Sequence, residues 1–179
     1  MKVLVDADSL PKQVRAIVIK AAIKRNLDIT FISDRYLKDI ESAYNKHTSL
    51  LRTEAKSKGI IERVDLIKIK SPITQIVVET GENSADDKLV ELAEDGDLAI
   101  THDIPLSDRL VEKGVLVLDD RGSIYTENNI KTRLSLRNAM TELRSYGVNL
   151  EKNSGMKDKD VKAFADAFSS TLDKKLRNN

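Results

Sequence analysis

The stretch Lys2-Val3-Leu4-Val5-Asp6-Ala7-Asp8-Ser9 opens the chain with a short apolar run that stops at two carboxylates. An apolar run of this length, bounded by polar residues, is typical of a buried parallel strand. A helix is expected next, because Pro11 suits a first helical position. Apolar residues then recur at helical spacing, at Val14, Ile17, Val18, Ala21 and Ala22. The opening of the chain therefore predicts a strand followed by a helix.

The same unit recurs along the chain. Further strand-like runs lead into polar residues, at 29–32, 73–78, 98–101 and 115–118. Helical patterns lie between some of them, for example at 89–93 and 106–111. Alternating strands and helices predict an α/β fold: a three-layer α/β/α sandwich with a central, mostly parallel, Rossmann-like sheet.

Two stretches have a less regular pattern. Residues 45–63 are polar and basic and predict a loop with a helical piece, while residues 64–70 predict one further strand. Residues 126–146 predict a long helix that ends at Gly147. Its buried positions are expected at Ile130, Leu134, Leu136, Met140 and Leu143.

The length of 179 residues fits one domain. We expect residues 1–147 to form the α/β domain. Residues 148–179 should add a polar loop, over 149–159, and a C-terminal helix that packs on the domain or trails from it. That helix carries apolar residues on one side, at Val161, Phe164, Phe168 and Leu172.

Composition excludes several classes of protein. The 30 Lys and Arg residues nearly cancel the 29 Asp and Glu residues, so the net charge of +1 gives no global attraction to nucleic acid or anionic membrane. With no cysteine and only 2 histidines, a disulfide framework, a thiolate nucleophile and a zinc site are not expected. No apolar run is long enough for a membrane span or a signal peptide. We expect a cytoplasmic protein with no membrane partner and no organic cofactor.

Carboxylates follow several of the predicted strands. In a parallel α/β sheet, ligands bind beyond the carboxyl ends of the strands. Asp6 and Asp8 follow the first strand, Asp103 follows the 98–101 run, and Asp86 and Asp87 begin the helix after the third strand. Carboxylates gathered at one edge raise one another's pKa unless a cation is present. All-oxygen ligation suits Mg²⁺ or Mn²⁺, which predicts metal-assisted phosphodiester hydrolysis.

Helix capping is the alternative interpretation of these carboxylates. It explains Asp8, Asp86 and Asp87 as well as a metal site does, because a carboxylate is favoured at a helix N-terminus. It explains Asp6 and Asp103 less well. Asp6 in particular ends a strand that should be buried, where an unpaired charge is costly.

The histidines and the basic residues are interpreted in two ways. We expect His102 to be a surface or hydrogen-bonded histidine and His47 to be solvated. Basic side chains predict nucleic-acid contacts or a solvated face; they are Arg52, Lys56, Arg121, Arg133 and Arg137. The last two share a helix face with Arg144. Aromatic residues make up only 4% of the chain, so base stacking along a single strand is poorly supported.

Four motifs together resemble those of the YaiI/YqxD family of small bacterial proteins. They are Val5-Asp6-Ala7-Asp8 with Pro11, Ala85-Asp86-Asp87, residues 96–106, and residues 121–126 with Asn129-Ile130. The resemblance implies a PIN-like fold and a metal-dependent ribonuclease site built from Asp6, Asp8, Asp86, Asp87 and Asp103. This chain departs from the family where a Cys often precedes the first-motif proline, since Ser9-Leu10-Pro11 stands here, and where Asn83 replaces an earlier Asp.

The leading hypothesis is a Mg²⁺- or Mn²⁺-dependent nuclease that hydrolyses RNA with metal-activated water. Asp6, Asp86, Asp87 and Asp103 would hold the ion, and Asp8 would be a ligand or orient the water. One alternative is a non-catalytic module that binds RNA or protein with the same fold. The other is a phosphatase with an aspartate nucleophile, for which Asp6 and Asp8 have the spacing but the rest of the chain fits poorly.

Overall fold

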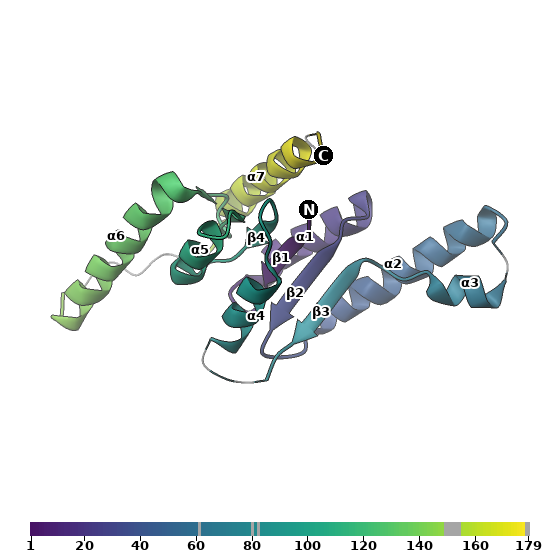
Figure 1. Cartoon of the computed structure of the whole chain (residues 1–179), viewed down its shortest axis with the longest axis horizontal. Coiled ribbons are helices and arrows are strands. Elements are labelled where there is room, and N and C mark those ends of the chain that lie inside the picture. Colours follow the sequence, from purple (N-terminus) through teal and green to yellow (C-terminus); the bar gives the residue numbers. More distant parts are fainter. Residues whose placement is uncertain (61, 80, 82, 149–154, 178–179) are drawn as a thin grey trace.

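The computed structural model describes residues 1–60, 62–79, 81, 83–148 and 155–177. Over these residues the strands form one sheet in the order β3-β2-β1-β4-β5-β6 (Figure 1). Their bounds are β1 Val3–Asp6, β2 Ile29–Ser33, β3 Ile73–Val77, β4 Leu98–Ile100, β5 Leu116–Leu118 and β6 Ile124–Tyr125. Strands β1 to β5 pair in parallel, and β6 pairs antiparallel with β5. The sequence did not predict β6, which has only two residues.

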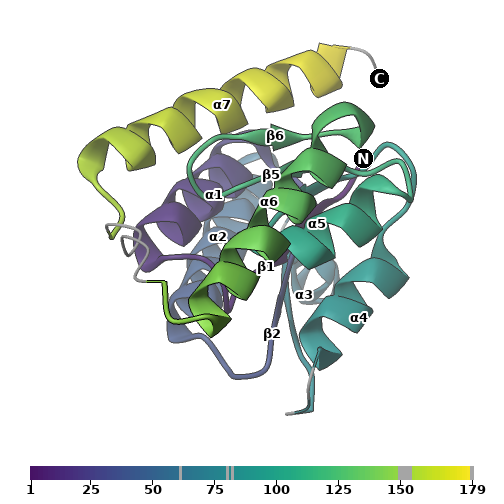
Figure 2. The same cartoon turned by 90° about the vertical axis from the view of Figure 1, so that its left-hand side faces the viewer.

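Helices cover both faces of the sheet. Their bounds are α1 Lys12–Arg25, α2 Lys38–Ser57, α3 Arg63–Lys68, α4 Ser84–Leu92, α5 Ile104–Val111, α6 Glu127–Ser145 and α7 Asp158–Arg177. Helices α1, α2 and α7 lie on one face and α4, α5 and α6 on the other (Figure 2). The buried side chains of each set form a separate core layer. The predicted three-layer α/β/α, Rossmann-like sandwich is confirmed.

Strand residues alternate between the two core layers. Val3 and Val5 of β1 face the α1 and α7 side, whereas Leu4 faces the α4 and α5 side. The predicted C-terminal helix is also confirmed: Phe164 and Phe168 of α7 are buried, with ring centroids 5.6 Å apart. Residues 149–154 of the predicted loop lie outside the described residues. Among the described helices, none is long and apolar enough to cross a membrane.

The position of β1 defines the edge of the sheet where a candidate site lies. It pairs with β2 on one side and with β4 on the other, although β4 is far later in the chain. Strand order therefore reverses between β1 and β4, which is the point where α/β sheets leave a crevice for a ligand. Asp6 lies at the carboxyl end of β1, and Asp103 lies just after β4.

The predicted strand over residues 64–70 was wrong, and the predicted loop with a helical piece over 45–63 was right only in part. Residues 38–57 form one helix of 20 residues, and residues 63–68 form α3 rather than a strand. The polar sequence of α2 hides an inward face on which His47 and Thr48 are buried. His47 was expected to be solvated; instead its Nδ1 lies 3.0 Å from Ser71 Oγ, and Thr48 Oγ1 accepts a hydrogen bond from Ser71 N. Here α2 is held by polar contacts with the segment before β3, which a search for apolar periodicity does not detect.

The predicted helix over 126–146 is present, but most of its expected buried positions are not buried. Only Ile130 is buried, whereas Leu136, Met140 and Leu143 are 50%, 37% and 42% exposed. The first turns of α6 are fixed by a capping box at Thr126 and by ion pairs of Lys131 with α5 and the residue after it. Beyond them the helix extends past the body of the molecule (Figure 1).

Gly122 provides a test of how α7 packs on the turn between β5 and β6. Its φ is +88°, and an added Cβ would lie 2.7 Å from the backbone oxygen of Ala163 in α7. Gly147 has a similar φ of +80° but open space around it. We expect Gly122→Ala to lower the free energy of unfolding by about 3 kcal/mol, from left-handed strain plus overpacking.

Gly147→Ala is the matched control, with an expected loss of about 1 kcal/mol from the strain alone. Urea unfolding followed by circular dichroism measures both losses. Equal losses in the two variants would mean that α7 does not pack on this turn.

Candidate functional site

Asp6 is a buried carboxylate held by hydrogen bonds at the end of the central strand. The residue is only 6% exposed. Asp6 Oδ2 accepts a hydrogen bond of 2.7 Å from the Thr101 hydroxyl, and Oδ1 accepts a weak one of 3.4 Å from Ser9 N. The buried carboxylate is thus stabilised by hydrogen bonds from protein donors. No lysine or arginine among the described residues forms an ion pair with it.

Thr101 connects Asp6 to Asp103. Its hydroxyl is fully buried, donates to Asp6 and accepts a hydrogen bond of 3.0 Å from the backbone N of Asp103. Asp103 Oδ1 in turn accepts from Leu106 N at 2.8 Å and caps α5. Capping, which the sequence analysis disfavoured for Asp103, therefore does occur there. A single hydroxyl fixes the positions of both acidic residues.

Asp86 is the third acidic group at this edge. It lies in the first turn of α4, after Asn83 in a left-handed conformation. Burial, together with the negative charges of Asp6 and Asp103, raises the pKa of Asp86 to about 6. The charge of Arg109 opposes them. Three carboxylates from distant parts of the sequence thus lie within electrostatic reach of one another.

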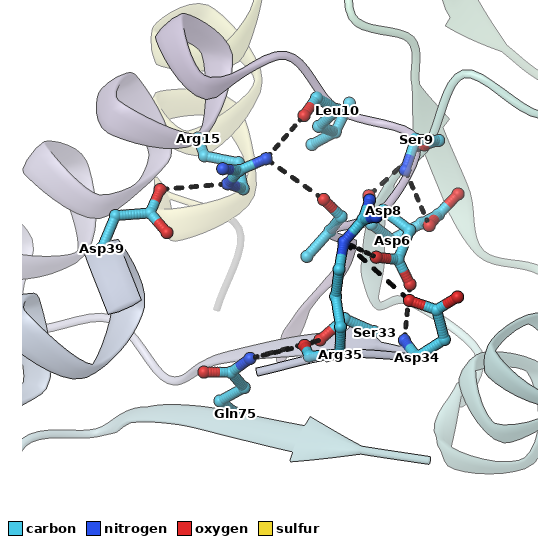
Figure 3. Close-up of polar contacts among 11 residues, drawn as sticks. Asp6, Asp8, Ser9, Leu10, Arg15, Ser33, Asp34, Arg35, Asp39 and Gln75 are labelled. Atoms are coloured by element: carbon cyan, nitrogen blue, oxygen red, sulfur yellow. Dashed lines mark hydrogen bonds and ion pairs between the residues drawn. The ribbon is translucent and has the colours of Figure 1, made fainter. Parts of the chain in front are cut away.

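Asp8 and Asp87 are directed to other partners. Asp8 Oδ2 accepts from Asp34 N at 2.6 Å, and Asp8 Oδ1 lies 3.3 Å from Arg35 Nε (Figure 3). Burial is the main cause that raises the pKa of the Asp8 carboxyl. Asp87 is largely exposed and forms an ion pair of 2.6 Å with Arg109. The structure therefore gathers Asp6, Asp86 and Asp103 and pairs the other two with arginines.

The acidic edge does not form a closed set of metal ligands. Over the part of the chain that is described, no three His, Asp or Glu side chains are grouped so as to hold a metal ion. The donors are nevertheless of the right kind, because Mg²⁺ is usually bound by one or two carboxylates and completes its shell with water. Asp6 and Asp86, with Asp103 beside them, fit such an open site for Mg²⁺ or Mn²⁺ by their chemistry.

A cleft of about 720 Å³ lies next to the acidic edge. Ser9, His102 and Asp103 line one side of it. The other side is formed by α6, which contributes Arg133, Leu136, Arg137, Met140 and Arg144. Within the described residues these arginines form no ion pair, in contrast to Arg15, Arg35 and Arg109. The cleft thus has a carboxylate on one wall and uncompensated positive charge on the other.

His102 adds a polar group to the same cleft. Its Nδ1 lies 2.8 Å from Asp120 Oδ1, which confirms the expected hydrogen-bonded histidine. That hydrogen bond raises the pKa of the imidazole, although burial opposes the shift. Asp120 is itself buried, so it fixes the orientation of the ring.

The predicted nucleic-acid residues are divided between separate places. Arg133 and Arg137 line the cleft. Arg52 donates to the carbonyl oxygens of Ile67 and Ile69, and both Arg52 and Lys56 belong to α2, on the opposite side of the molecule from α6 (Figure 1). Arg121 forms an ion pair of 3.6 Å with Asp160 of α7. The cleft therefore contains only part of the predicted basic set.

Arg15 supports the site and was not anticipated. Its Nη1 donates to the carbonyl oxygens of Leu10 and Ala7, at 2.8 and 3.3 Å, and its Nε pairs with Asp39 at 3.1 Å (Figure 3). These contacts fix the loop between β1 and α1, which follows Asp6 and carries Asp8. No local sequence signal indicates them, because the carboxylate partner lies 24 residues away.

The bridging role of Thr101 can be tested with two variants. Thr101→Val keeps the shape of the side chain but leaves a buried carboxylate oxygen without its donor and Asp103 N without its acceptor. We expect it to lower the free energy of unfolding by about 2 kcal/mol. Thr101→Ser keeps the hydroxyl and should cost about 1 kcal/mol, for the lost methyl group. Urea unfolding at pH 7 distinguishes the two, and equal losses would contradict the bridge.

The raised pKa of Asp86 predicts a pH-dependent stability. The pKa of its carboxyl is about 6 in the folded state and 3.8 in the unfolded state, so well below pH 3.8 the carboxyl is protonated in both states. Between about pH 4 and pH 6 it ionises in the unfolded state but stays protonated in the folded state, so the protein loses stability across this window and no further stability above it. In EDTA, Asp86→Asn should therefore match the wild-type Tm near pH 3 and exceed it at pH 7.5.

Asp65→Asn is the control for this measurement, because Asp65 is an exposed α3 residue paired with Lys68. Its difference from wild type should not change with pH. Parallel profiles of Tm against pH for Asp86→Asn and wild type would show that the pKa of the Asp86 carboxyl is not raised in the folded protein.

Comparison with known proteins gives one consistent result. A family model described as "Uncharacterized BCR, YaiI/YqxD family" matches residues 60–174. A UPF0178 protein of Maridesulfovibrio salexigens is 35% identical over 98% of both chains. One of Treponema denticola is 34% identical over 99% of this chain and 95% of its own. One of Citrifermentans bemidjiense is 36% identical over 100% of this chain and 98% of its own. These names state no activity, and no solved structure matches the fold.

Proposed function

The chain belongs to the YaiI/YqxD family, and we propose that it is a Mg²⁺- or Mn²⁺-dependent nuclease that hydrolyses RNA phosphodiesters. The observation that carries the proposal is the gathering of Asp6, Asp86 and Asp103 at the reversal point of the sheet. Burial and mutual repulsion raise the pKa of Asp86 to about 6. A divalent cation would relieve this repulsion, and a protein gains little from such an arrangement without one.

We propose that Asp6 and Asp86 hold the ion directly and that Asp103 binds it directly or through water. When bound, the ion activates water and stabilises the negative charge that develops on the phosphoryl group under attack. The protein supplies the positions of the carboxylates: Thr101 orients Asp6 and Asp103 together. Arg15 fixes the loop that follows Asp6. Asp8 and Asp87 then act indirectly, since each already has an arginine partner.

The cleft beside the acidic edge supports a phosphodiester as the substrate. A phosphate group in this cleft would meet arginine side chains on the α6 wall and Asp103 on the other. Arginine binds phosphate oxygens in a bidentate manner, which holds the ester in one orientation. We extend the proposal to a PIN-like classification and a cytoplasmic location, which the strand-end carboxylates and the cysteine-free sequence favour.

Cleavage of labelled RNA tests this function. We expect the purified protein to cut a synthetic RNA in Mn²⁺ or Mg²⁺ and to lose the activity in EDTA. Asp6→Asn should lower the rate at least a hundredfold, because it weakens the metal site while keeping the side-chain shape. Asp65→Asn, on α3, should retain full activity.

A second measurement guards against a contaminating nuclease. Mn²⁺ should raise the Tm of the wild-type protein at pH 7 and should raise that of Asp6→Asn much less. Equal stabilisation of both proteins, or equal cleavage by both, would contradict the proposal. RNA binding that persists in EDTA without any cleavage in Mn²⁺ would favour the non-catalytic alternative.

A further inference from the structure

The projecting part of α6 carries two neighbouring stripes of different chemistry. At about 100° per residue, Arg133, Arg137 and Arg144 lie within about 40° of one another around the helix axis. Leu136 and Met140 occupy the adjoining strip of the same surface. Side chains from both stripes line the cleft. The helix therefore presents a charged stripe and an apolar stripe side by side to whatever enters the cleft.

Among the described residues, the charged stripe lacks the carboxylate partners that several other basic side chains have. Lys131, on the same helix, pairs with Asp108 at 2.9 Å and with Glu112 at 2.6 Å. Within the described residues, Arg133, Arg137 and Arg144 have no such carboxylates. Like charges held this close on one helix face repel one another. The stripe therefore favours an anion, and its length of about 16 Å along the helix exceeds one phosphate group. The ligand that fits it is a chain of phosphates.

The apolar stripe indicates which form of that chain is bound. Leu136 and Met140 are 50% and 37% exposed although both line the cleft. A ligand that covers them gains from removing apolar surface from water. The bases of duplex RNA are stacked inside the helix, whereas those of an unpaired segment are free to contact side chains.

We propose that the cleft under α6 binds an unpaired RNA segment, with its phosphates on Arg133, Arg137 and Arg144 and its bases against Leu136 and Met140. The inference rests on the proposed function for its choice of RNA, and it assigns the substrate class of that site. An acidic protein segment would bring the same sign of charge to Asp103 as RNA does, so it is the proposed hydrolysis of phosphodiesters that selects RNA. A phosphodiester must reach that wall to be cleaved.

Fluorescence anisotropy in EDTA tests the proposal without any need for cleavage. The probes are a labelled 12-nucleotide RNA without self-complementarity and the same RNA annealed to its complement. We expect the wild-type protein to bind the single strand at least tenfold more tightly. The Arg133→Ala/Arg137→Ala double variant should lose at least tenfold in affinity. Its slope of log K against log salt should fall by about 1.4, the value for two lost phosphate contacts on a single strand.

Two further variants separate charge from apolar contact. Lys20→Ala/Lys24→Ala removes two exposed charges of the same spacing from α1, across the sheet, and should bind as wild type does. Leu136→Ser/Met140→Ser should weaken single-strand binding severalfold and leave the salt slope unchanged. Because these side chains are exposed, all three variants should keep the wild-type Tm.

Several outcomes would overturn the inference. They are equal affinity for the duplex, unchanged binding by the arginine double variant, and equal losses in the α1 and α6 double variants. Failure of the proposed function is distinguishable from these. Selective binding in EDTA with no cleavage in Mn²⁺ would contradict the nuclease and support the binding cleft. Cleavage by the arginine double variant with unchanged KM would support the nuclease and contradict the binding cleft.

Discussion

The parallel pairing of β1 with β4 is the constraint on which the rest of the site depends. The two strands are separated by about half of the chain, yet their pairing places Val5 beside Ile100. The residues just beyond each strand are then neighbours as well, so the Thr101 hydroxyl reaches the Asp6 carboxylate at 2.7 Å. Without this pairing Asp6 would be a buried charge with too few donors.

The same pairing creates an electrostatic imbalance that the protein resolves only in part. Asp8 and Asp87 are each neutralised by an arginine, whereas the three carboxylates nearest the reversal point have hydrogen bonds or partial burial instead. Across the cleft, α6 presents arginines that have no carboxylate partner among the described residues. Opposite charges thus face one another across a space large enough for a ligand. A substrate that carries both a phosphate and a bound cation is complementary to both walls.

Sequence patterns predicted the fold where burial was apolar and periodic. The runs that became β1, β2, β3, β4 and β5 were all identified. Strands covered on both faces are almost continuously apolar, and the edge strand β3 keeps an apolar run although two of its five residues are exposed. Hydropathy patterns failed to predict burial where polar contacts bury a side chain, or where an apolar side chain lies on a helix that extends away from the domain. In α2, His47 and Thr48 are buried through hydrogen bonds with Ser71, which a hydropathy pattern does not reveal. In α6, Leu136 and Met140 have the helical spacing of core residues, yet they are 50% and 37% exposed.

The sequence by itself determined the α/β class and the identity of the acidic residues that follow the strands, because both depend on short contiguous segments of the sequence. It did not determine which of those residues would meet. Only the tertiary structure separated Asp6, Asp86 and Asp103 from Asp8 and Asp87, since that division depends on Thr101, Arg35 and Arg109, which come from other elements. The physical reason is that a carboxylate's environment is set by its neighbours in space, and those are fixed by strand order and helix packing rather than by distance along the chain.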